Sequence, residues 1–282
     1  MMKSQLPGMS PGSVKDGKTT AEKFLRLREV IYQLRSPGGC PWDREQDFAS
    51  MKPRFLEEVY ELIDALEQND FLGMREELGD LFFHLLFMAL LGEEGNHWTL
   101  DDVLDEIAEK LIRRHPHVFA QSGTIESSSQ VLTQWDEIKK QIEGKNYQSL
   151  LDNVPQSLPP LQKACVYGKK GRKVGFDWQS ASEVLPKLYE ELQEVEEAMA
   201  GDDREALAEE LGDLFLAMVS LVRHLDFEPE GLVRAANRKF EYRFREMERI
   251  AAVQKTSLEQ LSLEEKEILW QMAKKRQEQE SS

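Results

Sequence analysis

Two acidic segments say most about the architecture of this chain: Glu57-Glu58-Val59-Tyr60-Glu61 and Glu76-Glu77-Leu78-Gly79-Asp80. Both segments return 133 residues later, as Glu190-Glu191-Leu192-Gln193-Glu194 and Glu209-Glu210-Leu211-Gly212-Asp213. So many identities in one register, without a gap, indicate a duplicated domain.

In each copy the spacing predicts two helices that fold back on one another. Residues three or four apart share a helix face, so Glu58 lies beside Glu61, and Glu77 lies beside Asp80. If the chain turns at Asn69, Glu61 and Glu77 are each eight residues from the turn, and Glu58 and Asp80 are each eleven. The second copy has the same symmetry about its own turn. Each hairpin is therefore predicted to bring four carboxylates together in two facing pairs.

Such a cluster is a candidate metal site. Carboxylates held together raise each other's pKa values unless cations neutralise them. Oxygen ligands suit Mg²⁺, or Mn²⁺ as a substitute, better than zinc or copper. A di-iron bundle would place histidine where these helices carry the last aspartate. The predicted metal ligands are Glu58, Glu61, Glu77 and Asp80 in the first copy and Glu191, Glu194, Glu210 and Asp213 in the second.

An alternative interpretation makes these carboxylates the solvent faces of acidic helices, paired with ordinary lysine and arginine neighbours. The mirrored spacing in both copies argues against it, because a solvent face does not require such symmetry.

Outward from the hairpins, apolar residues at helical spacing predict further helices and no sheet. The predicted helices cover residues 21–34, 53–66, 74–91, a stretch from the Thr99 cap to residue 114, a stretch around 135–142, and then 181–200, 205–225, 229–250 and 263–276. The basic segment from Gly168 to Lys173 is expected to be an exposed loop.

The chain therefore divides into a disordered tail at residues 1–20, an N-terminal domain at 21–150, a linker rich in proline and polar residues at 151–160, and a C-terminal domain at 161–282.

Length and composition agree with two soluble domains. The chain has 282 residues, of which 40% are apolar, and these are enough to build two cores. A net charge of −16 argues against nucleic-acid polymers or anionic membranes as partners. The two cysteines lie far apart and provide no disulfide framework. No apolar signal segment opens the chain, and residues 81–91 are too short a run to cross a bilayer, so a cytoplasmic protein is expected.

The acidic pattern resembles that of the MazG family of nucleoside triphosphate pyrophosphohydrolases. Three more segments are similar to two-domain members of that family: Cys40-Pro41-Trp42-Asp43, His115-Pro116-His117-Val118-Phe119 and Gly175-Phe176-Asp177-Trp178. The likeness covers nearly everything from Ala21 to about Lys275. It implies an all-α fold of two tandem MazG-like helical bundles, each built around an acidic αα-hairpin, with Mg²⁺ held by the acidic residues and with a homodimer as the assembly.

The reaction that the resemblance implies cuts a nucleoside triphosphate between its α and β phosphates and releases the monophosphate and pyrophosphate. The implied nucleotide-binding residues are Lys187, Lys239, Arg243, Trp270 and Lys139. The spacing of these residues supports the implied role in part. Lys187 lies one turn before Glu191, and Lys239 and Arg243 share one helix face. Trp270 suits either stacking on a base or packing in a core or an interface.

Metal-activated water is the expected nucleophile. Its proton would pass to a carboxylate outside the metal set, and both Glu190 and Glu209 are candidates for this catalytic role.

The second copy is expected to carry most of the turnover. Lys239 and Arg243 align approximately with Arg114 and Val118, so the first copy lacks one of the two cations. The first copy is then structural, regulatory or differently selective.

Two other functions stay open. One is a related pyrophosphohydrolase that acts on a different nucleotide compound. The other is a helical scaffold, or a cation-binding interaction protein, without turnover. Within the first-choice function, broad cleaning of the nucleotide pool is the expected role.

Overall fold

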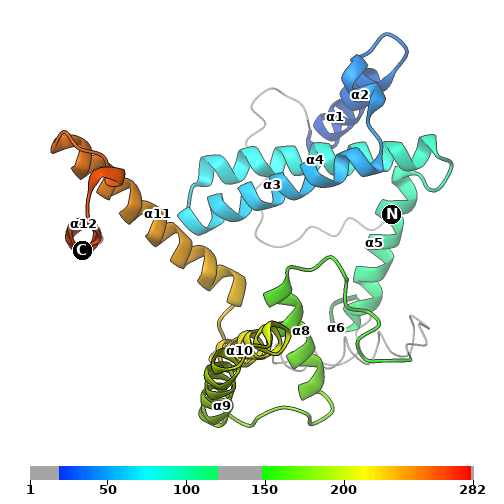
Figure 1. The fold of residues 1–282 in the computed structure, drawn as a ribbon. Coiled ribbons are helices and arrows are strands. Elements are labelled where there is room, and N and C mark those ends of the chain that lie inside the picture. Colours follow the sequence, from blue (N-terminus) through cyan, green and yellow to red (C-terminus); the bar gives the residue numbers. More distant parts are fainter. Residues whose placement is uncertain (1–18, 120–147, 281–282) are drawn as a thin grey trace. The chain divides into compact units, whose positions relative to one another are not determined.

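The computed structural model describes residues 19–119 and 148–280, and the chain splits into two compact units, Met1–Gly144 and Lys145–Ser282. All elements in these residues are helices, which confirms the predicted all-α fold (Figure 1). None of the described helices is long and apolar enough to span a membrane. Lys139, the stretch around residues 135–142 and nearly all of the predicted tail lie outside the described residues.

The first unit is built around a long helical hairpin. Its elements are α1 (Thr20–Arg35), α2 (Pro41–Glu45), α3 (Phe48–Gln68), α4 (Phe71–Glu94), α5 (Leu100–Arg114) and α6 (Pro116–Phe119). Helices α3 and α4 run side by side in opposite directions (Figure 1). The turn works because Asn69 adopts the left-handed conformation, with φ of 56°, and the Asp70 side chain accepts hydrogen bonds from the first backbone amides of α4.

Helix α3 begins earlier than the predicted residue 53. The Asp47 carboxylate accepts from the amide of Ser50 at 2.8 Å, and the Ser50 hydroxyl accepts from the amide of Asp47. This reciprocal cap starts the helix at Phe48, so Pro53 lies inside it. The core of the unit forms where α1 and α3 meet the second half of α4, with Ile31, Met51 and Phe87 almost fully buried.

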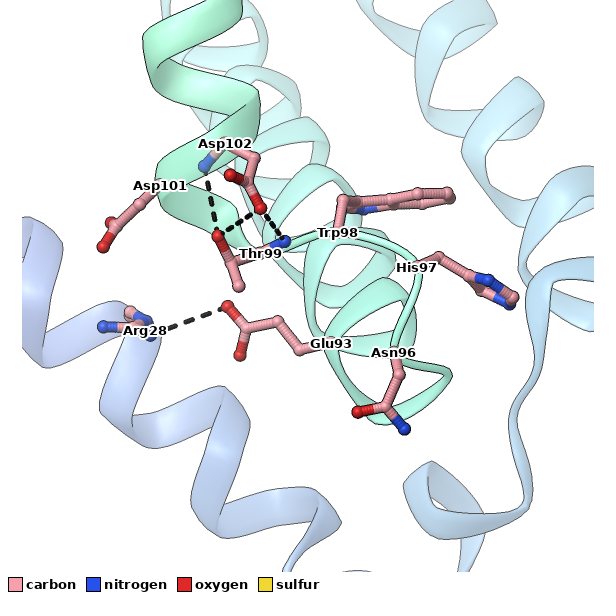
Figure 2. A pocket seen from close by; sticks show the side chains of 8 residues that line it. All are labelled: Arg28, Glu93, Asn96, His97, Trp98, Thr99, Asp101 and Asp102. Atoms are coloured by element: carbon pink, nitrogen blue, oxygen red, sulfur yellow. Dashed lines mark hydrogen bonds and ion pairs between the residues drawn. The ribbon is translucent and has the colours of Figure 1, made fainter.

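The far end of α4 is tied to its neighbours by polar contacts. Figure 2 shows Thr99 and Asp102 in the reciprocal cap of α5, and Arg28 of α1 at 3.7 Å from Glu93. A shallow hollow of about 510 Å³ lies among these residues. Glu93 is 13 residues beyond Asp80, a distance of about 20 Å along a helix. The hollow therefore lies away from the carboxylates.

The second unit repeats the hairpin. Its elements are α8 (Pro160–Arg172), α9 (Ala181–Ala200), α10 (Arg204–His224), α11 (Pro229–Val253), the 3₁₀ turn η1 (Leu258–Gln260) and α12 (Leu263–Glu280). Helices α9 and α10 pack together as α3 and α4 do (Figure 1). Helix α9 has the predicted bounds, and the side chain of Asp203 caps α10 as Asp70 caps α4.

The prediction that Gly168–Lys173 is an exposed loop was wrong. Residues up to Arg172 belong to α8, which packs against α10. The packing is close at Gly168, where a Cβ atom would lie 2.6 Å from Nε of Arg223. The preceding segment also packs on this unit, because Val154 is buried and Lys170 donates from Nζ to the carbonyl of Leu150 at 2.7 Å.

Arg223 holds the loop between α8 and α9. Its guanidinium donates two hydrogen bonds to Asp177, at 2.7 and 2.6 Å, and Nε2 of His224 lies 3.1 Å from the same carboxylate. Arg223 is only 6% exposed. These hydrogen bonds, those from Arg223 above all, lower the pKa of Asp177 to about 2.

Replacing Asp177 by Asn is expected to reduce the free energy of unfolding at pH 7 by about 2 kcal/mol, from the difference between its usual and its lowered pKa. A lowered pKa in the folded state stabilises the protein above the ordinary pKa of the group. The difference between the wild-type protein and Asp177→Asn should therefore shrink as the pH falls from about 4 to about 2. Urea unfolding at several pH values measures this, and a difference that does not depend on pH contradicts it.

Candidate metal and nucleotide site

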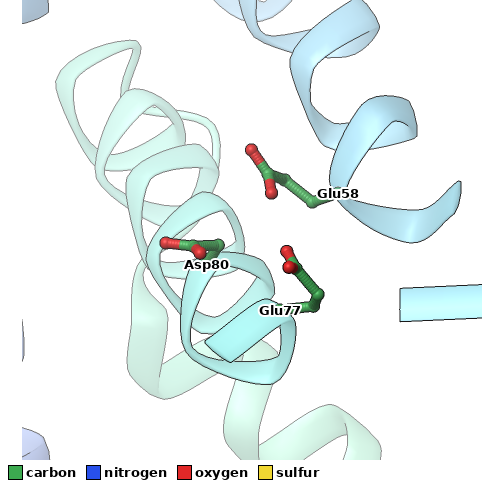
Figure 3. A group of neighbouring side chains, drawn as sticks. All are labelled: Glu58, Glu77 and Asp80. Atoms are coloured by element: carbon green, nitrogen blue, oxygen red, sulfur yellow. The ribbon is translucent and has the colours of Figure 1, made fainter. Parts of the chain in front are cut away.

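Three carboxylates of the first hairpin converge. Figure 3 shows Glu58 of α3 facing Glu77 and Asp80 of α4, and one oxygen from each lies within 4.8 Å of the others. Burial, followed by repulsion from Asp80 and Glu61, raises the pKa of Glu58. Burial and the repulsion of its neighbours, Glu61 first, raise the pKa of Glu77. Glu61 is not a member of the close group, but its charge acts on both of these glutamates.

The second hairpin forms a similar group from Glu191, Glu194 and Glu210, again with ligand oxygens within 4.8 Å of one another. Glu191 is only 4% exposed. Burial raises the pKa of Glu194, and the positive charge of Lys187 opposes that shift. Asp213, the fourth predicted ligand, is not a member of this close group.

The residues present fit a bound cation. Oε2 of Glu77 and Oε2 of Glu191 are buried and have no hydrogen-bond partner within the described part of the chain. A buried carboxylate oxygen without a donor is costly, and a cation between the three carboxylates would remove that cost. Since every member of both groups offers oxygen, the donor set suits a hard divalent cation.

Lys187 reaches the second group from the same helix. Its Nζ lies 2.7 Å from Oε1 of Glu191 and 2.9 Å from Oε1 of Glu190. These hydrogen bonds raise the pKa of Lys187, the contact with Glu191 more than that with Glu190. The lysine is therefore a fixed positive charge beside the predicted metal ligands. Glu209, the other candidate proton acceptor, is exposed on α10.

Arg243 and Trp270 come together on α11 and α12. The guanidinium carbon of Arg243 lies 5.5 Å from the centre of the Trp270 ring, and Nε of Arg243 donates to Gln277. Lys239 is exposed one helical turn before Arg243. The contacts described for these residues do not reach the carboxylates of α9 and α10. A base-stacking role and a packing role are both compatible with the half-buried position of Trp270.

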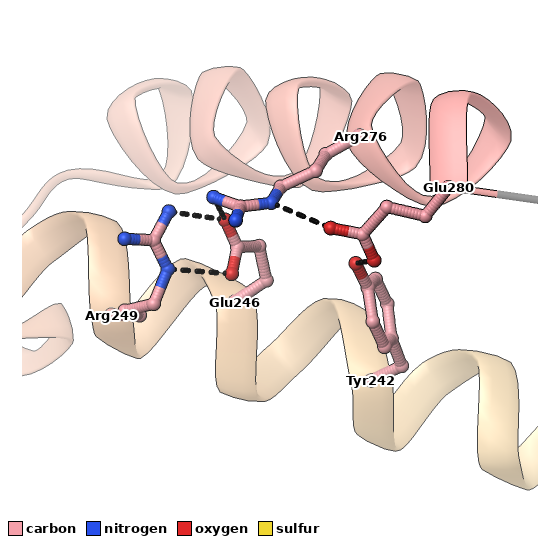
Figure 4. A network of polar contacts seen from close by, with 5 residues as sticks. All are labelled: Tyr242, Glu246, Arg249, Arg276 and Glu280. Atoms are coloured by element: carbon pink, nitrogen blue, oxygen red, sulfur yellow. Dashed lines mark hydrogen bonds and ion pairs between the residues drawn. The ribbon is translucent and has the colours of Figure 1, made fainter.

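A polar network fastens α12 to α11 beside this pair. Figure 4 shows the carboxylate of Glu246 between the guanidinium groups of Arg249 and Arg276, each at 2.7 Å, while Arg276 also binds Glu280. Tyr242 donates a hydrogen bond to Glu280 as well. The two arginines lower the pKa of Glu246, which is buried. The network thus holds α12, and Trp270 on it, against α11.

Sequence reasoning gave no role to His84 or to the Asp177–Arg223 pair. His84 lies one turn after Asp80, and that position was the one available signal. The pairing of Asp177 with Arg223 spans 46 residues and was not visible in local spacing.

The profile of the MazG nucleotide pyrophosphohydrolase domain matches residues 46–119 and 179–248. These two segments contain α3 with α4 and α9 with α10 in full. The chain belongs to the MazG family.

MazG relatives match most of the chain. The nucleoside triphosphate pyrophosphohydrolase of Escherichia coli K12 is 44% identical over 256 residues, which are 89% of this chain and 97% of that protein. The nucleoside triphosphate pyrophosphohydrolase/pyrophosphatase MazG of Thermotoga maritima is 40% identical over 251 residues, or 89% of this chain and 95% of its own. The crystal structure of a mazG-related protein from Thermotoga maritima aligns with 41% of this chain and 98% of its own, with a TM-score of 0.36 and 28% identity. The matches to the two enzymes confirm the predicted resemblance to this family.

Glu246→Gln is expected to lower the free energy of unfolding by about 1–2 kcal/mol, because three charge-assisted hydrogen bonds from two arginines to a buried group are weakened or lost. The arginines are about half exposed, and solvent screening keeps the effect at this size. The matched control is Glu248→Gln, an exposed glutamate on the same helix. Equal urea midpoints for the two variants would contradict a fastening role for Glu246.

Proposed function

We propose that this protein is a Mg²⁺-dependent nucleoside triphosphate pyrophosphohydrolase that cleaves between the α and β phosphates. The observation that carries the proposal is that each hairpin brings three carboxylates together, in a chain that belongs to the MazG family. The names of its relatives in Escherichia coli and Thermotoga maritima support the substrate class. Broad action on the nucleotide pool is part of the proposal.

In the second hairpin, the carboxylates would bind the metal ion and Lys187 would bind a phosphate. Glu191, Glu194 and Glu210, with Asp213 nearby in sequence, would hold Mg²⁺, and Mn²⁺ is a substitute with the same ligand preference. When bound, the cation would polarise the phosphate oxygens and activate the attacking water. Lys187 would turn from Glu191 to a phosphate oxygen, since it needs only to rotate its own side chain.

A carboxylate outside the close group would accept the proton from the attacking water. Glu190 and Glu209 both remain candidates. Nζ of Lys187 lies 2.9 Å from Oε1 of Glu190, so the lysine has to move away before that oxygen can accept the proton of the water. Lys239, Arg243 and Trp270 supply two positive charges and an aromatic face for the nucleotide.

The second domain is proposed to carry most of the turnover. Lys187 lies within ion-pair distance of the carboxylates there, whereas its counterpart in the first domain, Arg54, has its guanidinium 4.7 Å from the ring of Trp42. A phosphate at the first site would thus meet a different arrangement of charge.

Purified protein with Mg²⁺ is expected to release pyrophosphate from nucleoside triphosphates, and EDTA should abolish the release. Glu191→Gln should reduce kcat by about 100-fold or more, because one metal ligand loses its charge. The equivalent Glu58→Gln in the first domain should leave most of the turnover. Assays of pyrophosphate release from a panel of ribo- and deoxynucleoside triphosphates test the EDTA sensitivity and both variants. Identification of the nucleoside monophosphate product confirms the position of cleavage.

The control for these variants is Glu196→Gln, which changes an exposed glutamate on α9. Equal losses from Glu191→Gln and Glu58→Gln would refute the division between the domains. No release from any nucleotide would favour a scaffold without turnover, and release from some other pyrophosphate compound would favour the related-enzyme alternative.

A homodimer is proposed from the apolar faces of the hairpins. Large apolar side chains recur at helical spacing on α9 and α10 and are at least 40% exposed; they are Tyr189, Leu192, Leu211, Phe215 and Met218. The first hairpin exposes a matching set, Leu56, Tyr60, Leu78, Phe82 and Leu85. Such contiguous stripes mark association surfaces, and two hairpins that pair along them form a four-helix bundle.

Replacing Phe215 by Ser is expected to shift the protein from dimer towards monomer, since a centrally placed aromatic side chain contributes strongly to an apolar interface. Light scattering after gel filtration reports the mass. Leu263→Ser is the matched control, because Leu263 is exposed at the start of α12 and lies outside both stripes. A wild-type protein that is monomeric at micromolar concentration would contradict the dimer.

A further inference from the structure

The two hairpins hold equivalent metal-binding glutamates in different ways. Glu58 and Glu191 occupy the same place in the repeat. In the first domain, Nε2 of His84 on α4 lies 3.6 Å from Oε1 of Glu58. In the second domain the position of His84 is taken by Ala217, and Lys187 contacts Glu191 instead, at 2.7 Å.

His84 is built into the protein rather than left at its surface. It is 4% exposed, and Nδ1 has no hydrogen-bond partner among the residues that the structure describes. Its ring packs edge-on against Phe55 and Phe83, with centroids 6.4 and 5.2 Å away. The two phenyl rings fix the plane of the imidazole, so Nε2 is directed at the carboxylate of Glu58.

His84 contacts a member of the close carboxylate group without belonging to the group itself. His84 is not among the three residues whose ligand atoms lie within 4.8 Å of one another, but Glu58 is. At 3.6 Å, Nε2 is just beyond a normal hydrogen bond. Hydrogen bonds to ligating carboxylates orient the ligand and commonly change metal affinity by 10- to 100-fold. A small movement of Glu58 brings it within reach of an Nε2–H donor.

Lys187 has the opposite effect on the second site. Its ammonium group occupies one oxygen of Glu191, so a cation that approaches this carboxylate meets a like charge. The lysine leaves most readily when a triphosphate offers it another anion. Cation binding at the second site is therefore linked to nucleotide binding. At the first site, no lysine or arginine within the described residues contacts Glu58, so none has to leave before a cation binds.

We propose that His84 is a positioning residue that orients Glu58 for a divalent cation, and that the first-domain site consequently binds its cation before nucleotide arrives, whereas the second-domain site binds cation and nucleotide together. This inference rests on the proposed metal-dependent function. It gives the first domain a defined role as a site that is filled without substrate.

The test measures Mn²⁺ binding to the full chain by electron paramagnetic resonance of the free ion. Each site is observed alone, the first in Glu191→Gln/Glu194→Gln protein and the second in Glu58→Gln/Glu77→Gln protein. At the first site, His84→Ala should weaken binding by about tenfold, and His84→Gln, which keeps a donor, should retain most of it. At the second site, Lys187→Gln should tighten binding in the absence of nucleotide.

A triphosphate with a methylene bridge between its α and β phosphates provides the second readout. It should tighten Mn²⁺ binding at the second site and leave the first site nearly unchanged. His97→Gln, an exposed histidine of the same unit, is the control and should alter neither site. Circular dichroism confirms that each variant is folded. If His84→Ala is not folded, His84→Leu takes its place, because leucine fills the buried space and removes the Nε2 donor.

Unchanged Mn²⁺ affinity at the first site in the variant that lacks the Nε2 donor overturns the positioning role. Tightening of both sites by the analogue to the same extent overturns the order of cation binding. Because Mn²⁺ binding is measured without turnover, its outcome is separate from that of the hydrolase assay. If the Mn²⁺ results are as expected but no pyrophosphate is released, the proposed hydrolase activity is rejected. The proposed order of cation binding would still hold.

Discussion

Like charges on facing helices have to be held together against their repulsion, and both hairpins are organised around that constraint. Two carboxylates about 4 Å apart in surroundings of effective dielectric 20 repel by about 4 kcal/mol. Tight turns and apolar cores oppose this. Each fully buried residue such as Phe87 or Ile31 contributes about 1.5–3 kcal/mol. The cores therefore keep the helices paired, and a bound cation would turn the remaining strain into stabilisation.

The duplication shows how one backbone frame supports two different sites. The capping aspartates and the glutamates are retained at the same spacing, so the hairpin itself sets the positions of the carboxylates. The turns differ, because Asn69 at the end of α3 is left-handed whereas Gly201 at the end of α9 is extended. The surrounding side chains differ, with His84 against Ala217 and Arg54 against Lys187. The two copies have thus diverged in side chains around the carboxylates, while the paired helices that hold the carboxylates are kept.

The fold was largely predictable from the sequence because its signals are local. Mirrored distances from Asn69 placed Glu58 opposite Asp80, and helical spacing gave the bounds of α9. Helix α8 was missed because Gly168 and its basic neighbours are typical of a loop, whereas the glycine is needed where α10 packs closely. The role of His84 depends on two phenyl rings that fix its plane. Spacing along one helix carries no information about such packing.

In the proposed function, charge balance means that the α9–α10 carboxylates would not bind a triphosphate by themselves. A triphosphate brings about four negative charges to a group that already holds three carboxylates, in a chain with a net charge of −16. Lys187 and one or two divalent cations leave part of that charge unmatched. Lys239 and Arg243 are the basic pair that the family resemblance assigns to the nucleotide, yet the described contacts of Arg243 lie with α12 and not with the carboxylates. In the proposed function, binding of a triphosphate would therefore require positive charge from outside the hairpin. That charge would come from α11 of the same chain or, in the proposed homodimer, from α11 of the second copy.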